Sequence, residues 1–201
     1  MRLLVMRHGE SEADRLDVHE GRADFELTER GHVQAQAMTR FIHKNYTVSA
    51  IYCSPLKRAK QTAMYLSQWT GIALEEDENL MEFNNGLIAG LPRDVAREKY
   101  PYIKNLPIHQ AVYEQESKLQ FRYRAEEALS RVLWEHGPDE TVVLVSHGGM
   151  INQLYHAFMR LPLESDIHVI TGDAGMHEWL ITDEKRVIVQ ANKMLHMEEG
   201  E

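Results

Sequence analysis

Two short apolar runs, each of which passes into a His-Gly pair, constrain the fold of this chain more than any other feature. Leu3–Met6 leads into Arg7 and His8, and Thr141–Val145 leads into His147. A short, continuous apolar run is typical of a strand that is buried on both faces, as in the middle of a parallel sheet. Because ligands bind at the carboxyl ends of parallel strands, we expect the two imidazoles to converge on one anion there.

Further strands alternate with amphipathic helices along the chain. This alternation is typical of the α/β class, and we expect a three-layer α/β/α sandwich with a mostly parallel central sheet. The other predicted elements are strands over 50–53 and 72–74, a hairpin of 175–181 with 186–191, and helices that start at Thr28, after Ser54, at Ser117 and at Gly149.

Local signals place several helix ends and one helix face. Ser54-Pro55 has the pattern of an N-cap followed by a first helical residue, and Gly71 is suited to end that helix. Ser117 and Gln120 have the spacing of a capping box. The helix that starts at Thr28 is expected to bury Val33, Ala37, Phe41 and Ile42.

The 201 residues are predicted to form a single domain, residues 1–201, with a small insertion over about 83–116. The insertion contains three prolines and no clear strand, and we expect it to cap the site. Tyr100, Tyr102 and Tyr113 in it are expected either to form an apolar wall that admits organic esters or simply to pack the cap against the core.

Composition limits the partners and the compartment. A formal net charge of −9 argues against binding to nucleic acid or to an anionic membrane surface. The sequence shows no signal peptide and no apolar stretch of the roughly 20 residues that span a membrane, so a cytoplasmic protein is expected. Cys53 is the only cysteine and is expected to be an inert buried thiol. No metal site is predicted, and histidines other than His8 and His147 are expected at the surface.

Four motifs occur in order along the chain: Arg7-His8-Gly9-Glu10, Ser54 with Arg58, Asn-Leu-Met followed by Glu82, and Ser146-His147-Gly-Gly. Together they resemble the histidine phosphatase superfamily, which includes the cofactor-dependent phosphoglycerate mutases. The resemblance spans nearly the whole chain. It implies a phosphoric monoester hydrolase of the histidine acid phosphatase type that needs neither metal nor cofactor.

The resemblance also implies a role for each motif. His8 would attack phosphorus and form a phosphohistidine that water hydrolyses. Arg7, Arg58 and His147 would hold the phosphoryl oxygens, where charge spreads in the transition state. Glu82 would protonate the leaving alkoxide and then activate water. The substrate-binding residues are expected to be Arg7, Gly9, Asp14, Glu20, Gly21, Arg58, His147 and Gly148.

Asp14 departs from the resemblance, because the family usually has asparagine there. An ionised aspartate only accepts hydrogen bonds and repels a phosphoryl group. Glu20, just before Gly21, adds a second carboxylate to the same segment. Three explanations stay open: Asp14 pairs with Arg15 or Arg22, the substrate carries an ammonium group, or the enzyme is a weak, unselective phosphatase.

The favoured substrate is a small-molecule phosphate ester, with a phosphoprotein as the other candidate. A mutase must hold a second acidic group, and the close mutases use a paired-arginine motif after the acid residue. The segment over 83–116 contains no such pair, which favours the phosphatase branch. A mutase-type transferase and a non-catalytic phospholigand-binding protein on the same fold remain the alternatives. The sequence does not indicate an oligomeric state.

Overall fold

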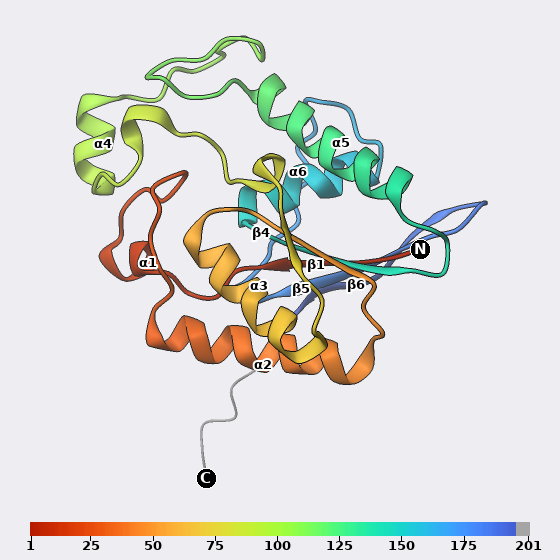
Figure 1. The fold of residues 1–201 in the computed structure, drawn as a ribbon. Coiled ribbons are helices and arrows are strands. Elements are labelled where there is room, and N and C mark those ends of the chain that lie inside the picture. Colours follow the sequence, from red (N-terminus) through yellow and green to blue (C-terminus); the bar gives the residue numbers. More distant parts are fainter. Residues whose placement is uncertain (196–201) are drawn as a thin grey trace.

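A six-stranded sheet forms the centre of the protein in a computed structural model, which describes residues 1–195. The strand order is β3-β2-β4-β1-β5-β6 (Figure 1). β1, β2, β3 and β4 are mutually parallel, whereas the β5–β6 hairpin adds an antiparallel edge. The strands are β1 (Arg2–Arg7), β2 (Ala50–Cys53), β3 (Leu74–Glu76), β4 (Thr141–Ser146), β5 (Met176–Ile181) and β6 (Arg186–Lys193).

Helices cover both faces of the sheet, and the predicted α/β/α sandwich is confirmed. α2 and α3 pack on one face and α5 and α6 on the other (Figure 1). β1 explains the continuous apolar runs, because Leu3 and Val5 belong to one core and Leu4 and Met6 to the opposite core. The helices are α1 (Glu12–Leu16), α2 (Glu29–Asn45), α3 (Lys57–Thr70), α4 (Arg93–Lys99), α5 (Lys118–Glu135) and α6 (Gly148–Phe158), with 3-10 turns η1 (Glu78–Leu80) and η2 (Gly86–Ile88).

The strand register brings the ends of three neighbouring strands to one edge. Arg7 at the end of β1 pairs with Ser146 at the end of β4, and Cys53 at the end of β2 pairs with Val145. The residues that follow these strands therefore lie side by side at the carboxyl edge of the sheet. This register is the structural basis of the candidate site.

Several predicted helix ends are confirmed. Thr28 caps α2 and accepts a hydrogen bond from the Gly31 amide at 3.0 Å. Ser117 and Gln120 form the capping box of α5, and Gly71 ends α3 with a φ of 74°.

The predicted start of α3 is wrong. The helix begins at Lys57 with Leu56 as its N-cap, so Ser54-Pro55 precedes it. The Ser54 hydroxyl instead lies 2.8 Å from His147 Nε2, a partner 93 residues away that no local pattern indicates. The third strand is also displaced along the chain, over Leu74–Glu76 rather than 72–74.

The buried face of α2 is only partly as predicted. Ile42 is buried, but Val33 is 50% exposed, and Ala35 and Met38 face the core instead. α2 packs against α3, and Met38 and Ile42 share one core cluster with Ala59, Ala63 and Leu66 of α3. The spacing of Val33, Ala37 and Phe41 fits a helix equally well, so periodicity alone could not choose between the two faces.

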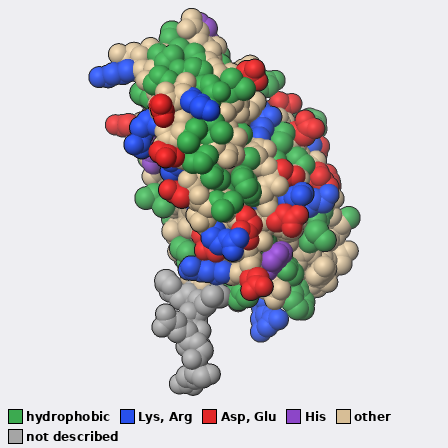
Figure 2. All heavy atoms as spheres, turned by 90° about the vertical axis from the view of Figure 1, so that its left-hand side faces the viewer, with side chains coloured by type: hydrophobic (Ala, Val, Ile, Leu, Met, Phe, Trp, Pro, Cys, Tyr) green, Lys and Arg blue, Asp and Glu red, His purple; other side chains and the backbone are tan. Residues whose placement is uncertain are grey.

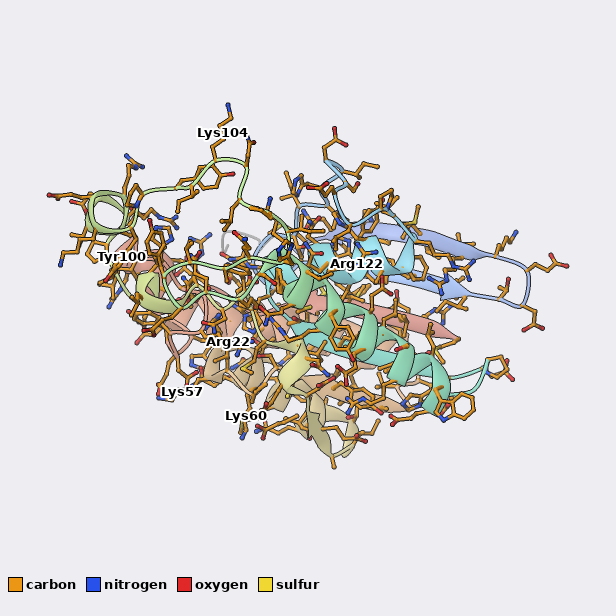
Figure 3. The ribbon with its side chains drawn as sticks, turned by 90° about the horizontal axis from the view of Figure 1, so that it is seen from above. Arg22, Lys57, Lys60, Tyr100, Lys104 and Arg122 are labelled. Atoms are coloured by element: carbon orange, nitrogen blue, oxygen red, sulfur yellow. The ribbon has the colours of Figure 1, made fainter. Side chains whose placement is uncertain are left out.

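The segment over 83–116 lies beyond the carboxyl end of β1, on the same side of the molecule as α1 (Figure 1). It contains η2 and α4, which the sequence pattern did not predict. Backbone hydrogen bonds join it to the loop after α1, from His19 to Leu91 and from Gly90 to His19. Seen from above, its residues Tyr100 and Lys104 lie at the opposite end of the molecule from the β5–β6 hairpin (Figure 3).

Hydrophobic side chains gather at the top of the face that this segment forms (Figure 2). Within residues 83–116, the large exposed hydrophobic side chains are Leu87, Tyr102 and Ile103, and Tyr102 is 84% exposed. Tyr100 and Tyr113 instead pack on each other, with ring centroids 5.2 Å apart. Tyr102 therefore does not pack the segment against the core. Across residues 1–195, no helix has the length and apolar character needed to cross a membrane.

Candidate active site

The central residues of the site directly follow three adjacent strands. His8 follows β1, His147 follows β4 and Ser54 follows β2. The His8 amide donates to the Ser146 carbonyl at 3.1 Å, and the Ser54 amide donates to the Val145 carbonyl at 3.0 Å. The sheet hydrogen bonding thus continues one residue past the strands and fixes the backbone from which the side chains project.

The His8 imidazole is buried and held in one tautomer. Its Nδ1 lies 2.7 Å from the Gly9 carbonyl oxygen, so Nδ1 carries the proton and Nε2 has a lone pair. Arg58 Nε donates to Nε2 at 3.2 Å. Burial, reinforced by the Arg58 and Arg7 guanidiniums, holds the pKa of His8 well below its usual range. The ring is therefore neutral at pH 7, and its Nε2 can act as a nucleophile.

Arg58 is fully buried at the start of α3 and is held at all three nitrogens. Nη1 donates to the Ala23 carbonyl at 3.0 Å and Nη2 to the Gly21 carbonyl at 2.8 Å. These bonds aim Nε at His8. Burial lowers the pKa of Arg58 from its usual value, although the group stays charged because a guanidinium is so strongly basic.

His147 lies beside His8, with ring centroids 5.0 Å apart. Its Nε2 is bonded to Ser54, while its Nδ1 has no hydrogen-bond partner among residues 1–195. Burial, followed by the charge of Arg58, holds the pKa of His147 well below its usual range. An unpartnered polar atom in a buried ring is costly, so this nitrogen is suited to bind a ligand.

Glu82 follows η1 and is held at the amino end of α6. Its Oε2 accepts from the Gly149 amide at 2.9 Å and its Oε1 from the Phe83 amide at 2.8 Å. A helix N-terminus stabilises a carboxylate. The neighbouring acids that compete with Glu82 in the sequence, Glu75, Glu76 and Glu78, are all exposed.

Arg124 of α5 is a positioning residue to which the sequence analysis assigned no role. Its Nη1 donates to the carbonyls of Asn79 and Met81 at 2.8 and 2.9 Å, and its Nη2 donates to the Glu82 carbonyl at 3.2 Å. The Glu116 carboxylate holds the same guanidinium at 2.6 Å. The chain that carries Glu82 is thereby fixed to α5, by contacts that span more than forty residues.

Arg7 is less buried than Arg58, with 22% of its side chain exposed. Its Nη1 lies 3.1 Å from both the Thr171 carbonyl oxygen and an Asp173 carboxylate oxygen. Its Nε has no partner among the described residues. The guanidinium therefore keeps a donor for a ligand, even though one carboxylate already neutralises part of its charge.

Asp14 pairs with neither Arg15 nor Arg22, so that explanation of its presence is wrong. One carboxylate oxygen accepts from the Ser11 amide at 2.9 Å and from the Ser11 hydroxyl at 3.1 Å. The other lies 3.8 Å from Arg7 Nη2. The capping box of α1 captures the side chain, because an acid three residues after an N-cap serine satisfies the free amide.

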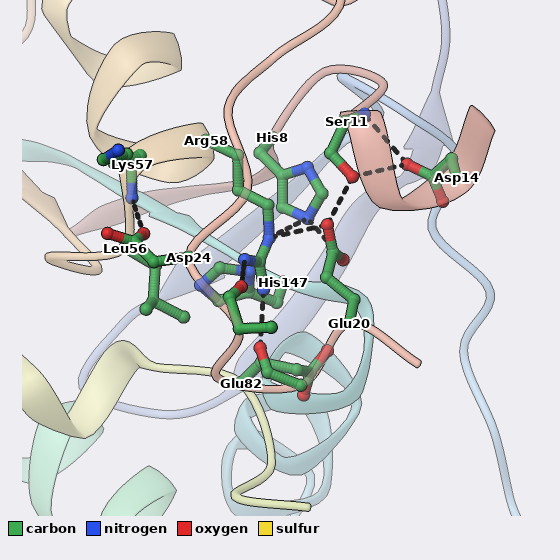
Figure 4. Close-up of polar contacts among 12 residues, drawn as sticks. His8, Ser11, Asp14, Glu20, Asp24, Leu56, Lys57, Arg58, Glu82 and His147 are labelled. Carbon is green, nitrogen blue, oxygen red and sulfur yellow. Dashed lines mark hydrogen bonds and ion pairs between the residues drawn. The ribbon is translucent and has the colours of Figure 1, made fainter. Parts of the chain in front are cut away.

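Glu20 lies in the middle of the cluster (Figure 4). Its Oε1 is 3.1 Å from Arg58 Nε and accepts from the Ser11 hydroxyl, and its Oε2 is 3.7 Å from His8 Nε2. Burial raises the pKa of Glu20, and the Arg58 charge offsets part of that rise. The carboxylate therefore occupies the space in front of the candidate nucleophile.

The glycines beside the two histidines differ in what requires them. A Cβ on Gly9 would overlap the carbonyl oxygen of Gly31, so the close packing of this turn on the start of α2 requires a glycine. A Cβ on Gly148 would have Arg7 Nε, at 3.9 Å, as its nearest neighbour, which leaves open space on the Arg7 side. Gly21 contributes its carbonyl to Arg58, as described above.

Two other histidines contradict the expected surface position. His177 is buried, its Nε2 lies 2.8 Å from the Thr171 hydroxyl, and burial lowers its pKa to about 4. His156 is buried on α6 with its Nε2 2.6 Å from the Ile167 carbonyl oxygen. His196 lies outside the described residues. Cys53 is buried as expected, and burial raises its pKa to about 12.

Comparison with known proteins gives a consistent result. The family described as the histidine phosphatase superfamily (branch 1) matches residues 3–194. A protein of Hydrogenobacter thermophilus named putative phosphoserine phosphatase 2 is 30% identical over 200 residues, which cover 97% of each chain. A glucosyl-3-phosphoglycerate phosphatase of Mycobacterium tuberculosis is 31% identical over 172 residues, which cover 81% of this chain and 77% of the relative.

Solved structures agree with this comparison. A mycobacterial glucosyl-3-phosphoglycerate phosphatase in complex with VO3 superposes with a TM-score of 0.81 at 26% identity, covering 95% of this chain and 98% of that one. A putative alpha-ribazole-5'-P phosphatase from Escherichia coli has a TM-score of 0.87 at 24% identity, covering 96% of both chains. The second likeness concerns the fold alone.

Proposed function

Because the chain belongs to the histidine phosphatase superfamily, we propose that it is a metal-independent phosphomonoesterase that works through a phosphohistidine on His8. The observation that carries the proposal is the state of His8. A neutral ring, protonated on Nδ1 by the Gly9 contact, offers the Nε2 lone pair at the carboxyl edge of the sheet. The relatives named as phosphatases support the same reaction class.

In the first step, His8 Nε2 attacks phosphorus, a P–N bond forms and the ester P–O bond breaks. Glu82, in its protonated form, gives its proton to the departing alkoxide. In the second step the Glu82 carboxylate takes a proton from water, the water oxygen attacks phosphorus, and the P–N bond breaks. His8 and Glu82 then return to their starting states as phosphate leaves.

The charge on the phosphoryl oxygens is met by the two guanidiniums and by His147. Arg58 Nε already lies 3.2 Å from the nucleophilic nitrogen, and Arg7 Nε and His147 Nδ1 are without partners among residues 1–195. Charge-assisted donors of this kind stabilise a developing oxyanion most when they are fixed in a dry site. The burial of Arg58 and His147 supports this role for them.

Residues 83–116 are proposed to form a cap within the single domain of residues 1–201. This cap is proposed to bind the alcohol part of the ester. A mainly apolar cavity of about 470 Å³ lies there, lined among others by Phe83, Tyr100, Ala111 and Tyr113. Phe83 directly follows Glu82, and an acid that protonates the leaving oxygen must lie on the leaving-group side. The proposed substrate is therefore a small organic phosphate ester. The proposed location is the cytoplasm, because Cys53, the only cysteine of the sequence, is a free thiol and the cytoplasm keeps thiols reduced.

The test is hydrolysis of p-nitrophenyl phosphate in EDTA by the wild type and by His8→Ala. We expect wild-type turnover to survive EDTA and to fall at least about a thousandfold in the variant, because the nucleophile is lost. Equal melting temperatures would exclude misfolding as the cause. Absence of turnover in the wild type would contradict the proposal and favour a phospholigand-binding protein, whereas a requirement for bisphosphoglycerate would favour a mutase.

A further inference from the structure

Glu20 occupies the position where an incoming phosphoryl group needs positive and donating partners. Its carboxylate takes up Arg58 Nε and the Ser11 hydroxyl, and its second oxygen lies 3.7 Å from His8 Nε2. Only 18% of its side chain is exposed. A tetrahedral phosphoryl group in line with His8 would need the same space and the same guanidinium.

The arginines of the pocket already face carboxylates of the protein, so an incoming phosphoryl group would compete with those carboxylates. Arg58 faces Glu20 at 3.1 Å, and Arg7 faces Asp173 at 3.1 Å and Asp14 at 3.8 Å. Each guanidinium is thus already matched by a carboxylate of the protein. A phosphoryl dianion that enters without any other change would meet little net positive charge and would lie against an anion.

The contact between Glu20 and His8 indicates how an anion can bind beside the Glu20 carboxyl group. Because Nδ1 holds the ring proton, His8 Nε2 presents a lone pair, and Glu20 Oε2 in front of it also presents lone pairs. Two acceptors that face each other repel, and a proton on the carboxyl group removes that repulsion. A substrate ammonium group in the same place would lie on the nucleophile itself, where phosphorus has to be.

We propose that Glu20 is a tethered competitor of the phosphoryl group and that an anion enters the site together with one proton, which Glu20 takes up. The inference rests on the phosphatase function proposed above and specifies how that site selects its ligand. Once protonated, the carboxyl group releases Arg58 Nε to the anion and offers its own O–H as a donor. Anion affinity then falls as pH rises, because the competitor is ionised.

Glu82 is the other carboxyl group of the site and is held by the Gly149 and Phe83 amides, whereas Glu20 Oε2 faces His8 Nε2. His8 stays neutral because burial and the two arginines depress its pKa, and Arg58 stays charged because a guanidinium is strongly basic. Burial raises the pKa of Glu20, Arg58 and the Ser11 hydroxyl offset part of that rise, and the negative charge of Asp14 adds to it. His19, the preceding residue, has its pKa lowered by burial and by Arg93. Glu20 is thus the group best placed to gain a proton when an anion arrives.

Sulfate is the probe, because its charge does not change over the range of interest and its binding needs no turnover. Titration calorimetry at about pH 5 and about pH 8 would compare the wild type with Glu20→Gln, which mimics the protonated acid. We expect wild-type affinity to fall by up to about tenfold per pH unit above the pKa of Glu20. The variant should bind more tightly than the wild type at the higher pH and should show little pH dependence.

Proton uptake gives a second readout. Calorimetry of the wild type in buffers with different ionisation enthalpies should show about one proton taken up per sulfate bound, and none for Glu20→Gln. Glu12→Gln is the matched control, since it removes one negative charge from the same segment but pairs with Arg15 at 2.6 Å rather than with the pocket. It should behave like the wild type.

Equal sulfate affinities of the wild type and Glu20→Gln at both pH values would overturn the proposal, as would binding without proton uptake. So would a variant that loses turnover on phosphoserine and keeps it on glycerol phosphate, because Glu20 would then be an acceptor for the substrate's ammonium group. These results differ from a failure of the phosphatase function, which would appear as absence of wild-type turnover, and from a failure of the His8 route, which would appear as turnover that persists in His8→Ala.

Discussion

The two sides of the candidate pocket are built in different ways. On the sheet side, His8, His147 and Arg58 are each at most 1% exposed; His8 and Arg58 bond to backbone carbonyls, and His147 bonds to the Ser54 hydroxyl. On the α1 side, Asp14 and Glu20 have 38% and 18% of their side chains exposed and are acidic. The difference indicates that the sheet supplies the chemistry of phosphoryl transfer, while the loops around α1 set the conditions under which an anion is admitted.

The strongest test of the sheet side is Arg58→Ala. We expect kcat/KM to fall by about a hundredfold to a thousandfold, because a donor to the phosphoryl oxygens is removed. Stability should fall as well, by about 3–5 kcal/mol, because the Glu20 carboxylate loses its buried partner. Steady-state kinetics and thermal unfolding would measure the two effects.

Arg30→Ala is the control, since Arg30 is 64% exposed and pairs with Glu10 at 3.4 Å. An exposed pair contributes less than about 1 kcal/mol, so both readouts should stay near the wild type. An Arg58→Ala variant that unfolds at the wild-type temperature and keeps its kcat/KM would remove the distinction between the two sides.

Glu82→Gln tests the acid that lies between the sheet edge and the cap. Turnover of an alkyl phosphate should fall by about a hundredfold or more, because the alkoxide must be protonated as it leaves. Turnover of p-nitrophenyl phosphate should fall less in the bond-breaking step, since p-nitrophenolate leaves without a proton. Glu78→Gln, a change at an exposed acid four residues earlier, is the matched control. Equal losses on both esters would contradict the assignment of Glu82 as the acid.

The sheet side was also the part of the site that the sequence could predict. Short apolar runs mark the strands, and His8 and His147 follow them directly, so strand ends and candidate nucleophile come from the same local pattern. Arg58 follows from its place in the motif after Ser54. Local sequence patterns identify these residues, and the parallel register of the strands then brings them together.

The contacts that the sequence could not predict join distant segments. Arg124 holds the carbonyl of Glu82 across 42 residues, and the Ser54 hydroxyl meets His147 across 93. Glu20 reaches Arg58 only because the loop after α1 folds back over α3. α4 escaped prediction for a local reason, since it is a short helix between Pro92 and Pro101, where prolines favour loops.

A bulky residue in the cap cavity tests whether the alcohol part of the ester binds there. Ala111→Trp replaces an exposed alanine of the lining and should reduce kcat/KM for naphthyl phosphate by about tenfold or more, because the ring loses its space. The same variant should leave sulfate affinity unchanged, since the proposed anion site lies at the sheet edge. An equal loss on naphthyl phosphate and on phosphoserine would show that the cavity does not distinguish the alcohol parts.

Asp14→Asn should have the smallest effect of these variants. It measures how strongly an acid of the α1 side other than Glu20 weakens anion binding. The asparagine oxygen can still accept from the Ser11 amide, which Asp14 holds at 2.9 Å, so α1 keeps its cap. Only the charge near Arg7 is lost, at 3.8 Å and partly exposed, and such a pair contributes at most about 1 kcal/mol. Inhibition by inorganic phosphate should therefore strengthen by about twofold to fivefold at neutral pH. An unchanged or weaker inhibition constant would mean that Asp14 serves α1 alone and that Glu20 is the only acid on this side that the anion meets.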